Sequence, residues 1–157
     1  MARTIDLSVN LVHSAQHSSG PLRTLEGAAL TVLEQRYKMF LALVQAYPER
    51  VLAPTGDIDA MWHLHMLHPR AYARDCMAMF GAIVDHDPAF GNPAAGAAGV
   101  AALDAHFAAT AALWERAFGT PYVLASLDAP AAPAPGATYC VKTGASYCVK
   151  AGAVASM

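Results

Sequence analysis

The sequence has few charged residues, and neither sign dominates. Asp, Glu, Lys and Arg make up 14% of the 157 residues, and 10 basic against 12 acidic side chains give a net charge of −2. A chain without excess positive charge lacks the electrostatic footprint that nucleic acids and anionic membrane surfaces require. We therefore expect neither nucleic acid nor membrane among its partners.

Long apolar runs and export signals are also missing. The longest charge-free apolar stretch, residues 88–103, is interrupted by glycines and a proline, so it does not predict a membrane-spanning helix. The first residues lack the charged-then-apolar layout of a signal peptide. We expect a cytoplasmic, reducing location. There, cysteines serve as free thiols, ligands or chemical targets before they form disulfides, and the chain has three: Cys76, Cys140 and Cys148.

Composition divides the chain into four segments. Residues 1–21 are polar and predicted to be irregular, whereas residues 22–122 hold nearly all the large apolar side chains and both tryptophans. Residues 123–135 form an Ala/Pro linker, and residues 136–157 form a tail built on a tandem octapeptide. Linker composition of this kind cannot build a core, so we expect the tail to lie outside the folded domain.

Apolar residues of the second segment recur at helical spacing, and no segment alternates convincingly with period two. The predicted fold class is all-α: a compact bundle of about four helices followed by a flexible Pro/Ala linker and tail. Breakers and capping residues set the expected helices at Thr24 to Pro48, Thr55 or Gly56 to Pro69, Pro69 to Gly81, and Ala97 to Gly119.

The most unusual stretch of sequence within these predicted helices runs from Asp59 to Cys76. It reads Asp-x-x-Trp-His-x-His-Met-Leu-x-Pro-x-x-Tyr-x-x-Asp-Cys, and Phe80-Gly81 and His86-x-Pro-x-Phe-Gly91 follow it. This pattern resembles the signature of the glycine-rich domain-containing protein-like family of plants and bacteria. The resemblance implies a helical domain. The RNA association of plant members is not expected here, because this chain has neither a glycine-rich region nor a basic patch.

The clustered histidines raise the possibility of a metal site. On one continuous helix His63 and His65 point about 200° apart, whereas His65 and His68 lie about 60° apart on one face. His65 and His68 can therefore supply two ligands to copper, zinc or iron, and a third must come from elsewhere. The candidates for that third ligand are Cys76, His86 and His106.

A structural role is the favoured interpretation of the same motif, and it requires no cofactor. Trp62 and His65 would then be core residues, with His65 bonded to a buried carbonyl or to Asp75. His63 would pair at the surface with Asp59, four residues earlier. The residues expected in structural places are Asp59, Trp62, His63, Tyr72, Asp75 and Cys76.

The tail repeats an octapeptide. Residues 136–143 read Gly-Ala-Thr-Tyr-Cys-Val-Lys-Thr, and residues 144–151 read Gly-Ala-Ser-Tyr-Cys-Val-Lys-Ala. Each unit presents a hydroxyl, a phenol and a reactive thiol in consecutive positions, Thr138-Tyr139-Cys140 and Ser146-Tyr147-Cys148. A repeated core after a linker resembles precursors of ribosomally synthesised, post-translationally modified peptides. A thiol metal-binding tail, a hairpin turning about Thr143-Gly144 and an inert tail remain alternatives.

We therefore expect a non-catalytic precursor or carrier. Its helical domain would be recognised by a modifying enzyme encoded nearby, an oxidase, radical enzyme or cyclase, and its Tyr-Cys units would be modified. One alternative is a metal-binding helical protein that modifies its own tail, and another is a protein-interaction module. An enzyme is the weaker class, because no nucleophile–base set, phosphate loop or suitable carboxylate pair is visible.

Overall fold

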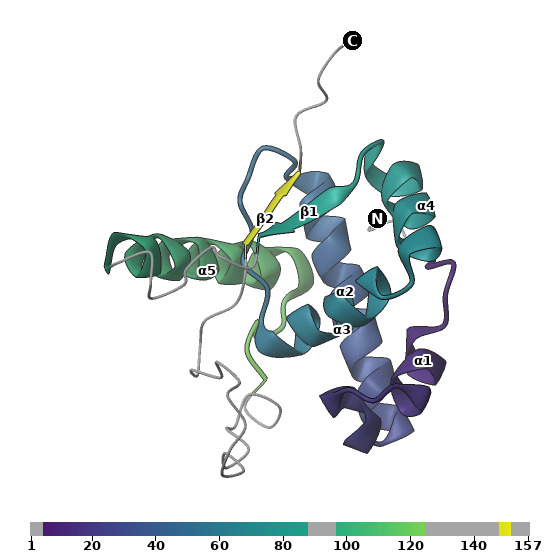
Figure 1. Ribbon diagram of the computed structural model, residues 1–157. Helices are drawn as coiled ribbons and strands as arrows, with labels where there is room; N and C mark the ends of the chain where they lie inside the picture. The colour runs from purple at the N-terminus through teal and green to yellow at the C-terminus, as the bar shows by residue number, and fades with distance from the viewer. Residues whose placement is uncertain (1–4, 88–96, 125–147, 152–157) are drawn as a thin grey trace.

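The computed structural model describes residues 5–87, 97–124 and 148–151 (Figure 1). It confirms the all-α fold class, and within these ranges no helix has the length and apolarity needed to cross a membrane. A two-stranded antiparallel pair is added to the helices. The elements are α1 Leu11–His17, the 3-10 helix η1 Pro21–Thr24, α2 Gly27–Ala46, α3 Gly56–Met66, α4 Pro69–Phe80, β1 Val84–Asp87, α5 Ala97–Phe118 and β2 Cys148–Ala151.

Helix α2 lies at the centre of the core. It contacts α1, α3 and α5, and its long axis runs behind α3 in Figure 1. Its apolar residues recur at the three- and four-residue spacing that places them on one face, which explains why this segment is a helix with a buried side. The buried apolar residues of α2 are Leu30, Leu33, Tyr37, Phe40, Leu41, Leu43 and Val44.

The irregular conformation predicted for residues 1–21 was wrong at α1. Asn10 caps this helix, and its side-chain oxygen accepts a hydrogen bond from the His13 backbone N–H at 2.9 Å. Leu11 and Ala15, four residues apart, are fully buried and join the main core. Two apolar residues and a cap therefore suffice for a helix here, although the segment as a whole is polar.

Helix α3 ends before His68, so the three clustered histidines do not lie on one continuous helix. It stops at Met66, and His68 occupies the N-cap position of α4, with Pro69 as its first residue. Proline is well accommodated at that position, because its missing N–H would have no intrahelical partner. At the other end of α4, Gly81 adopts a left-handed conformation with φ of 72°, as the sequence predicted from a glycine stop.

Strand β1 follows α4, and β2 comes from the second unit of the tail. The two strands pair antiparallel and lie side by side in Figure 1, with His86 opposite Val149 and Asp85 opposite Lys150. The sequence did not predict β1, and it offered a strand in the tail only as one arm of a hairpin between the two repeat units, whereas residues 148–151 pair with β1. It also placed the tail outside the folded domain, whereas residues 148–151 pair with it.

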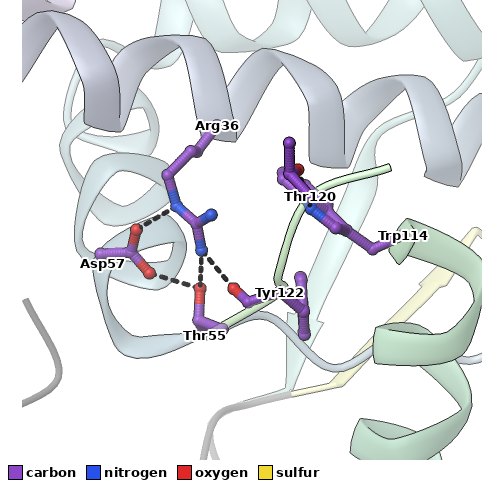
Figure 2. A network of polar contacts seen from close by, with 6 residues as sticks. All are labelled: Arg36, Thr55, Asp57, Trp114, Thr120 and Tyr122. Carbon is purple, nitrogen blue, oxygen red and sulfur yellow. Dashed lines mark hydrogen bonds and ion pairs between the residues drawn. The ribbon is translucent and has the colours of Figure 1, made fainter. Parts of the chain in front are cut away.

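A buried charge network joins α2, the start of α3 and the segment after α5 (Figure 2). The Arg36 guanidinium donates to the Asp57 carboxylate at 2.6 Å and also to the Thr55 hydroxyl and the Tyr122 carbonyl. It also lies over the Trp114 ring, 5.1 Å from the centroid. The side chains of Arg36 and Asp57 are only 7% and 4% exposed. Charges taken out of water persist only when paired, so this network fixes how the C-terminal segment meets the core.

A second buried network ties β1 to the two helices before it. Trp62 is 1% exposed, and its indole N–H donates to the Tyr72 hydroxyl at 2.9 Å. That hydroxyl donates in turn to the Val84 carbonyl. One hydroxyl thus connects α3, α4 and the first residue of β1, and it sets where the strand runs.

We expect Arg36→Met to lower the free energy of unfolding by about 3–5 kcal/mol, because the substitution leaves the buried Asp57 carboxylate without its cationic partner. Urea denaturation measures this. Lys38→Met is the matched control, since Lys38 pairs with Glu34 near the surface at 3.6 Å, and it should change stability by no more than about 0.5 kcal/mol. Equal effects of the two variants would contradict the prediction.

We expect Trp62→Ala to cost about 3–5 kcal/mol in metal-free protein, as loss of a fully buried indole leaves a cavity. Tyr72→Phe should cost about 1–3 kcal/mol, because it leaves the Trp62 N–H and the Val84 carbonyl unpaired. His63→Ala should cost about 1 kcal/mol or less, since its side chain is 47% exposed. Losses of similar size for Trp62→Ala and His63→Ala would contradict this account.

Candidate metal centre

Three ligand-bearing side chains converge where β1 passes the first turns of α3. Asp59 and His63 lie four residues apart on α3, which places them on one helix face. His86 comes from β1. His63 Nδ1 lies 3.2 Å from Asp59 Oδ2, and His86 Nε2 lies 3.0 Å from Asp59 Oδ1. One atom from each residue forms a set in which all separations are within 4.8 Å.

These separations can be compared with those of a bound ion. Ligand atoms about 2.1 Å from one metal, at angles of 90–109°, lie roughly 3.0–3.4 Å from each other. The two carboxylate–imidazole distances, 3.0 and 3.2 Å, lie in that range, each measured to a different oxygen of Asp59. The ring centroids of the two imidazoles lie 4.6 Å apart.

The electrostatics favour an ionised carboxylate at the centre of this set. Burial by itself raises the pKa of Asp59, but hydrogen bonds from His63 and His86 outweigh it and hold that pKa below its ordinary value. The hydrogen bond to Asp59 raises the pKa of His63 despite partial burial. A metal ion would replace the protons that now bridge the imidazoles and the carboxylate, because metal ligation requires a neutral imidazole.

The site is anchored on one side and open on the other. The His86 side chain is 5% exposed, and its ring centroid lies 4.5 Å from that of Trp62 with the two planes tilted by 60°, so the core fixes its position. The His63 side chain, at 47% exposure, forms the solvent side. An ion could therefore reach the three ligands from solvent without opening the core.

The ligand pair predicted from helical phase, His65 and His68, does not form within the described residues. The prediction assumed one helix through both positions, but α3 ends at Met66, and His68 caps the next helix. Cys76 is a buried free cysteine, and burial raises the pKa of its thiol. Of the five residues proposed as ligands, only His86 belongs to the cluster that the structure brings together, and His106 lies on α5.

His65 instead belongs to a buried polar group. Its Nδ1 lies 2.9 Å from the Tyr37 hydroxyl, and its Nε2 lies 3.2 Å from an oxygen of Asp75, though poorly aligned for a hydrogen bond. Burial lowers the pKa of His65 more than Asp75 raises it. In the neutral ring, Nδ1 accepts from the Tyr37 hydroxyl when the ring proton is on Nε2, which faces Asp75 without forming a hydrogen bond to it. Asp75 also accepts the Ser8 backbone N–H at 2.8 Å, which fixes the N-terminal segment on α4.

Of the residues proposed for modification, only Cys148 lies in the part of the chain that the structure describes. Its backbone begins β2, opposite Asp87. The other five predicted positions lie outside the described residues, namely Thr138, Tyr139, Cys140, Ser146 and Tyr147.

The sequence singles out Asp59, His63 and His86, but no pattern in it predicts that the three form one site. The four-residue spacing predicted the contact between Asp59 and His63, which was interpreted as a surface pair. No sequence signal placed His86 beside Asp59, because 27 residues separate them and the turn after α4 decides their approach.

Comparisons with known proteins match part of the chain. Residues 26–75 match the family model of the Glycine-rich domain-containing protein-like family. Two curated proteins of Arabidopsis thaliana are similar over 91 residues: Glycine-rich domain-containing protein 1 at 40% identity and Glycine-rich domain-containing protein 2 at 38%.

These matches cover a limited part of either molecule. Each alignment includes 55% of this chain, and the chain spans about 11% of the length of the curated relatives. No solved structure matches. The segment from residue 26 to residue 75 is thus similar to the Glycine-rich domain-containing protein-like family, as its motif predicted.

Proposed function

We propose that this domain binds a divalent transition metal ion through Asp59, His63 and His86. The observation that carries the proposal is the convergence of one carboxylate and two imidazoles, from two separate elements, within 4.8 Å. Only one of the three side chains is half exposed, and a packed core holds the other two in place. A preorganised ligand set of this kind reduces the cost of binding an ion.

The donor types restrict the choice of ion. Imidazole suits copper, zinc and iron, and two histidines with one carboxylate leave further coordination positions open, as in non-haem iron sites. Copper, zinc and iron, the ions of the alternative metal-binding interpretation of the histidine-rich motif, are the proposed candidates. The open positions would allow a further ligand to join the ion.

We expect purified metal-free protein to bind one Zn²⁺ or Co²⁺ per chain in calorimetric titrations. Asp59→Asn and His86→Ala should each weaken binding at least about tenfold, because each removes a direct ligand. His68→Ala is the control, since it changes a histidine of the same motif that caps α4 outside the cluster. Far-UV circular dichroism confirms that each variant is folded. Equal weakening by His68→Ala, or no binding to the parent protein, would contradict the proposal.

A second proposed function concerns the tail. Here the chain is a carrier whose Tyr-Cys units are modified, either by an oxidase, radical enzyme or cyclase encoded nearby or by the bound metal itself. The observation that favours it is the pairing of residues 148–151 with β1, because the second unit is then held against the domain. Cys140 and Cys148 are the proposed modification sites.

We expect intact-mass analysis, after co-expression with neighbouring genes, to show a mass change confined to residues 136–157. Cys140→Ala should halve the change, because two equivalent units carry it. Cys76→Ala is the control, since Cys76 is buried in the core, and it should leave the change intact. Two free thiols in the tail, with every neighbouring gene present, would contradict the carrier function.

A further inference from the structure

Two histidines of α1 form an exposed pair one helical turn apart. We infer that His13 and His17 are a second metal site, a two-imidazole chelate for Cu²⁺ or Ni²⁺ that bridges one turn of the helix. This α1 site is separate from the metal centre of Asp59, His63 and His86. Figure 1 shows α1 beside the first half of α2, whereas β1, which carries His86, lies toward the other end of α2.

The spacing of the two histidines places their side chains on one face of α1. Residues four apart are neighbours on a helix surface, and two histidines at this spacing are the pair that a helix offers to zinc in metalloproteases. In α1 the two imidazole ring centroids lie 4.2 Å apart, and the ring planes are tilted by 33°. Both residues are exposed, so a hydrated ion reaches both rings from solvent.

A hydrogen bond sets which nitrogen of His17 is available to an ion. Its Nδ1 lies 2.8 Å from the His13 backbone carbonyl oxygen. A carbonyl oxygen only accepts, so Nδ1 carries the proton, and the lone pair of the neutral ring is then on Nε2. Metal-binding histidines have this arrangement, in which the second nitrogen donates to a carbonyl or carboxylate and fixes the ring. His17 therefore presents Nε2 as a ligand before any ion binds.

The helix that carries the pair is held by the core. Leu11 and Ala15 are fully buried, and each lies two residues before one of the histidines, about 200° around the helix. The buried face and the histidine face are therefore directed to opposite sides, and Asn10 caps the helix. An ion on the outer face binds a preformed helix, which reduces the entropy lost on binding.

The donor set restricts the ion. Two imidazole nitrogens leave the other coordination positions to water, and tetragonal sites of nitrogen and oxygen ligands are typical of Cu²⁺ and Ni²⁺. Both ions also exceed Co²⁺ in their affinity for such ligands. A site with two protein ligands binds more weakly than the three-ligand metal centre, so stoichiometric Zn²⁺ fills that centre first.

The consequence of binding is a more stable α1. This helix has seven residues, and helices of that length are marginal on their own. One ion contacts both imidazoles only while the turn between them is helical. The ion therefore binds the helical state in preference to the open state, and it suppresses local opening by a factor of one plus the ratio of free ion to Kd.

The test uses the full chain without an affinity tag. Ni²⁺ is the probe, because cysteine thiols reduce Cu²⁺. Hydrogen exchange of a peptide covering α1, measured by mass spectrometry, should slow about tenfold when free Ni²⁺ is about ten times its Kd. His13→Ala should remove this effect, although it leaves the hydrogen bond from His17 Nδ1 to the backbone carbonyl in place. His17→Ala should remove it as well.

The matched control is Gln16→Ala, since Gln16 is an exposed polar residue of the same helix, and this variant should keep the slowing. Far-UV circular dichroism confirms that each variant is folded. No slowing in the parent protein, or slowing that persists in both histidine variants, would overturn the α1 site. A purely structural role of the pair would change exchange equally with and without Ni²⁺, and that result would overturn it too.

Asp59→Asn separates the α1 site from the metal centre. It removes a ligand of the centre and none of the α1 pair, so the effect of Ni²⁺ on α1 should persist. If Asp59→Asn abolishes the effect, the slowing originates at the metal centre, and the α1 site is wrong. If Zn²⁺ does not bind the parent protein while Ni²⁺ still slows exchange in α1, the metal centre fails and the α1 site stands.

Discussion

The hydrogen-bond chain from Trp62 through Tyr72 to Val84 is the interaction on which the candidate site depends. It is buried, and it joins α3, α4 and β1 through a single hydroxyl. Without it, the Trp62 N–H and the Val84 carbonyl would be left unpaired in the core, at a cost of about 1–3 kcal/mol. Fixing Val84 fixes the strand, and the strand brings His86 to the carboxylate of Asp59. A core contact therefore sets the geometry of a cluster that is partly open to solvent.

Strand β1 serves two purposes in the proposed functions. Toward the helices it contributes His86 to the cluster with Asp59 and His63. Toward the outside it pairs with the tail, whose second unit carries Cys148. One four-residue strand thus links the histidine-rich motif to the tandem octapeptide, the two most unusual features of the sequence.

The matched family segment and the candidate site overlap only in part. Residues 26–75 include Asp59 and His63, whereas His86 and the tail lie beyond the match. The segment also contains Arg36 with Asp57 and the buried His65, and their contacts hold α2, α3 and α4 together, which explains part of the matched sequence without any ligand. The motif therefore combines residues that build the domain with residues that build the candidate metal centre.

The sequence alone determined the helices, because helical spacing of large apolar residues and breakers such as Gly81 act locally. It also determined the contact of Asp59 with His63, which follows from a spacing of four. It did not determine α1, where a capping residue and two apolar residues lie in an otherwise polar segment. It also did not determine that α3 ends at Met66, between His65 and His68. Only the tertiary structure decided that His86 meets Asp59 and that the tail pairs with β1. Both contacts join residues far apart in sequence, and their geometry depends on how α4 turns into β1 rather than on any local pattern.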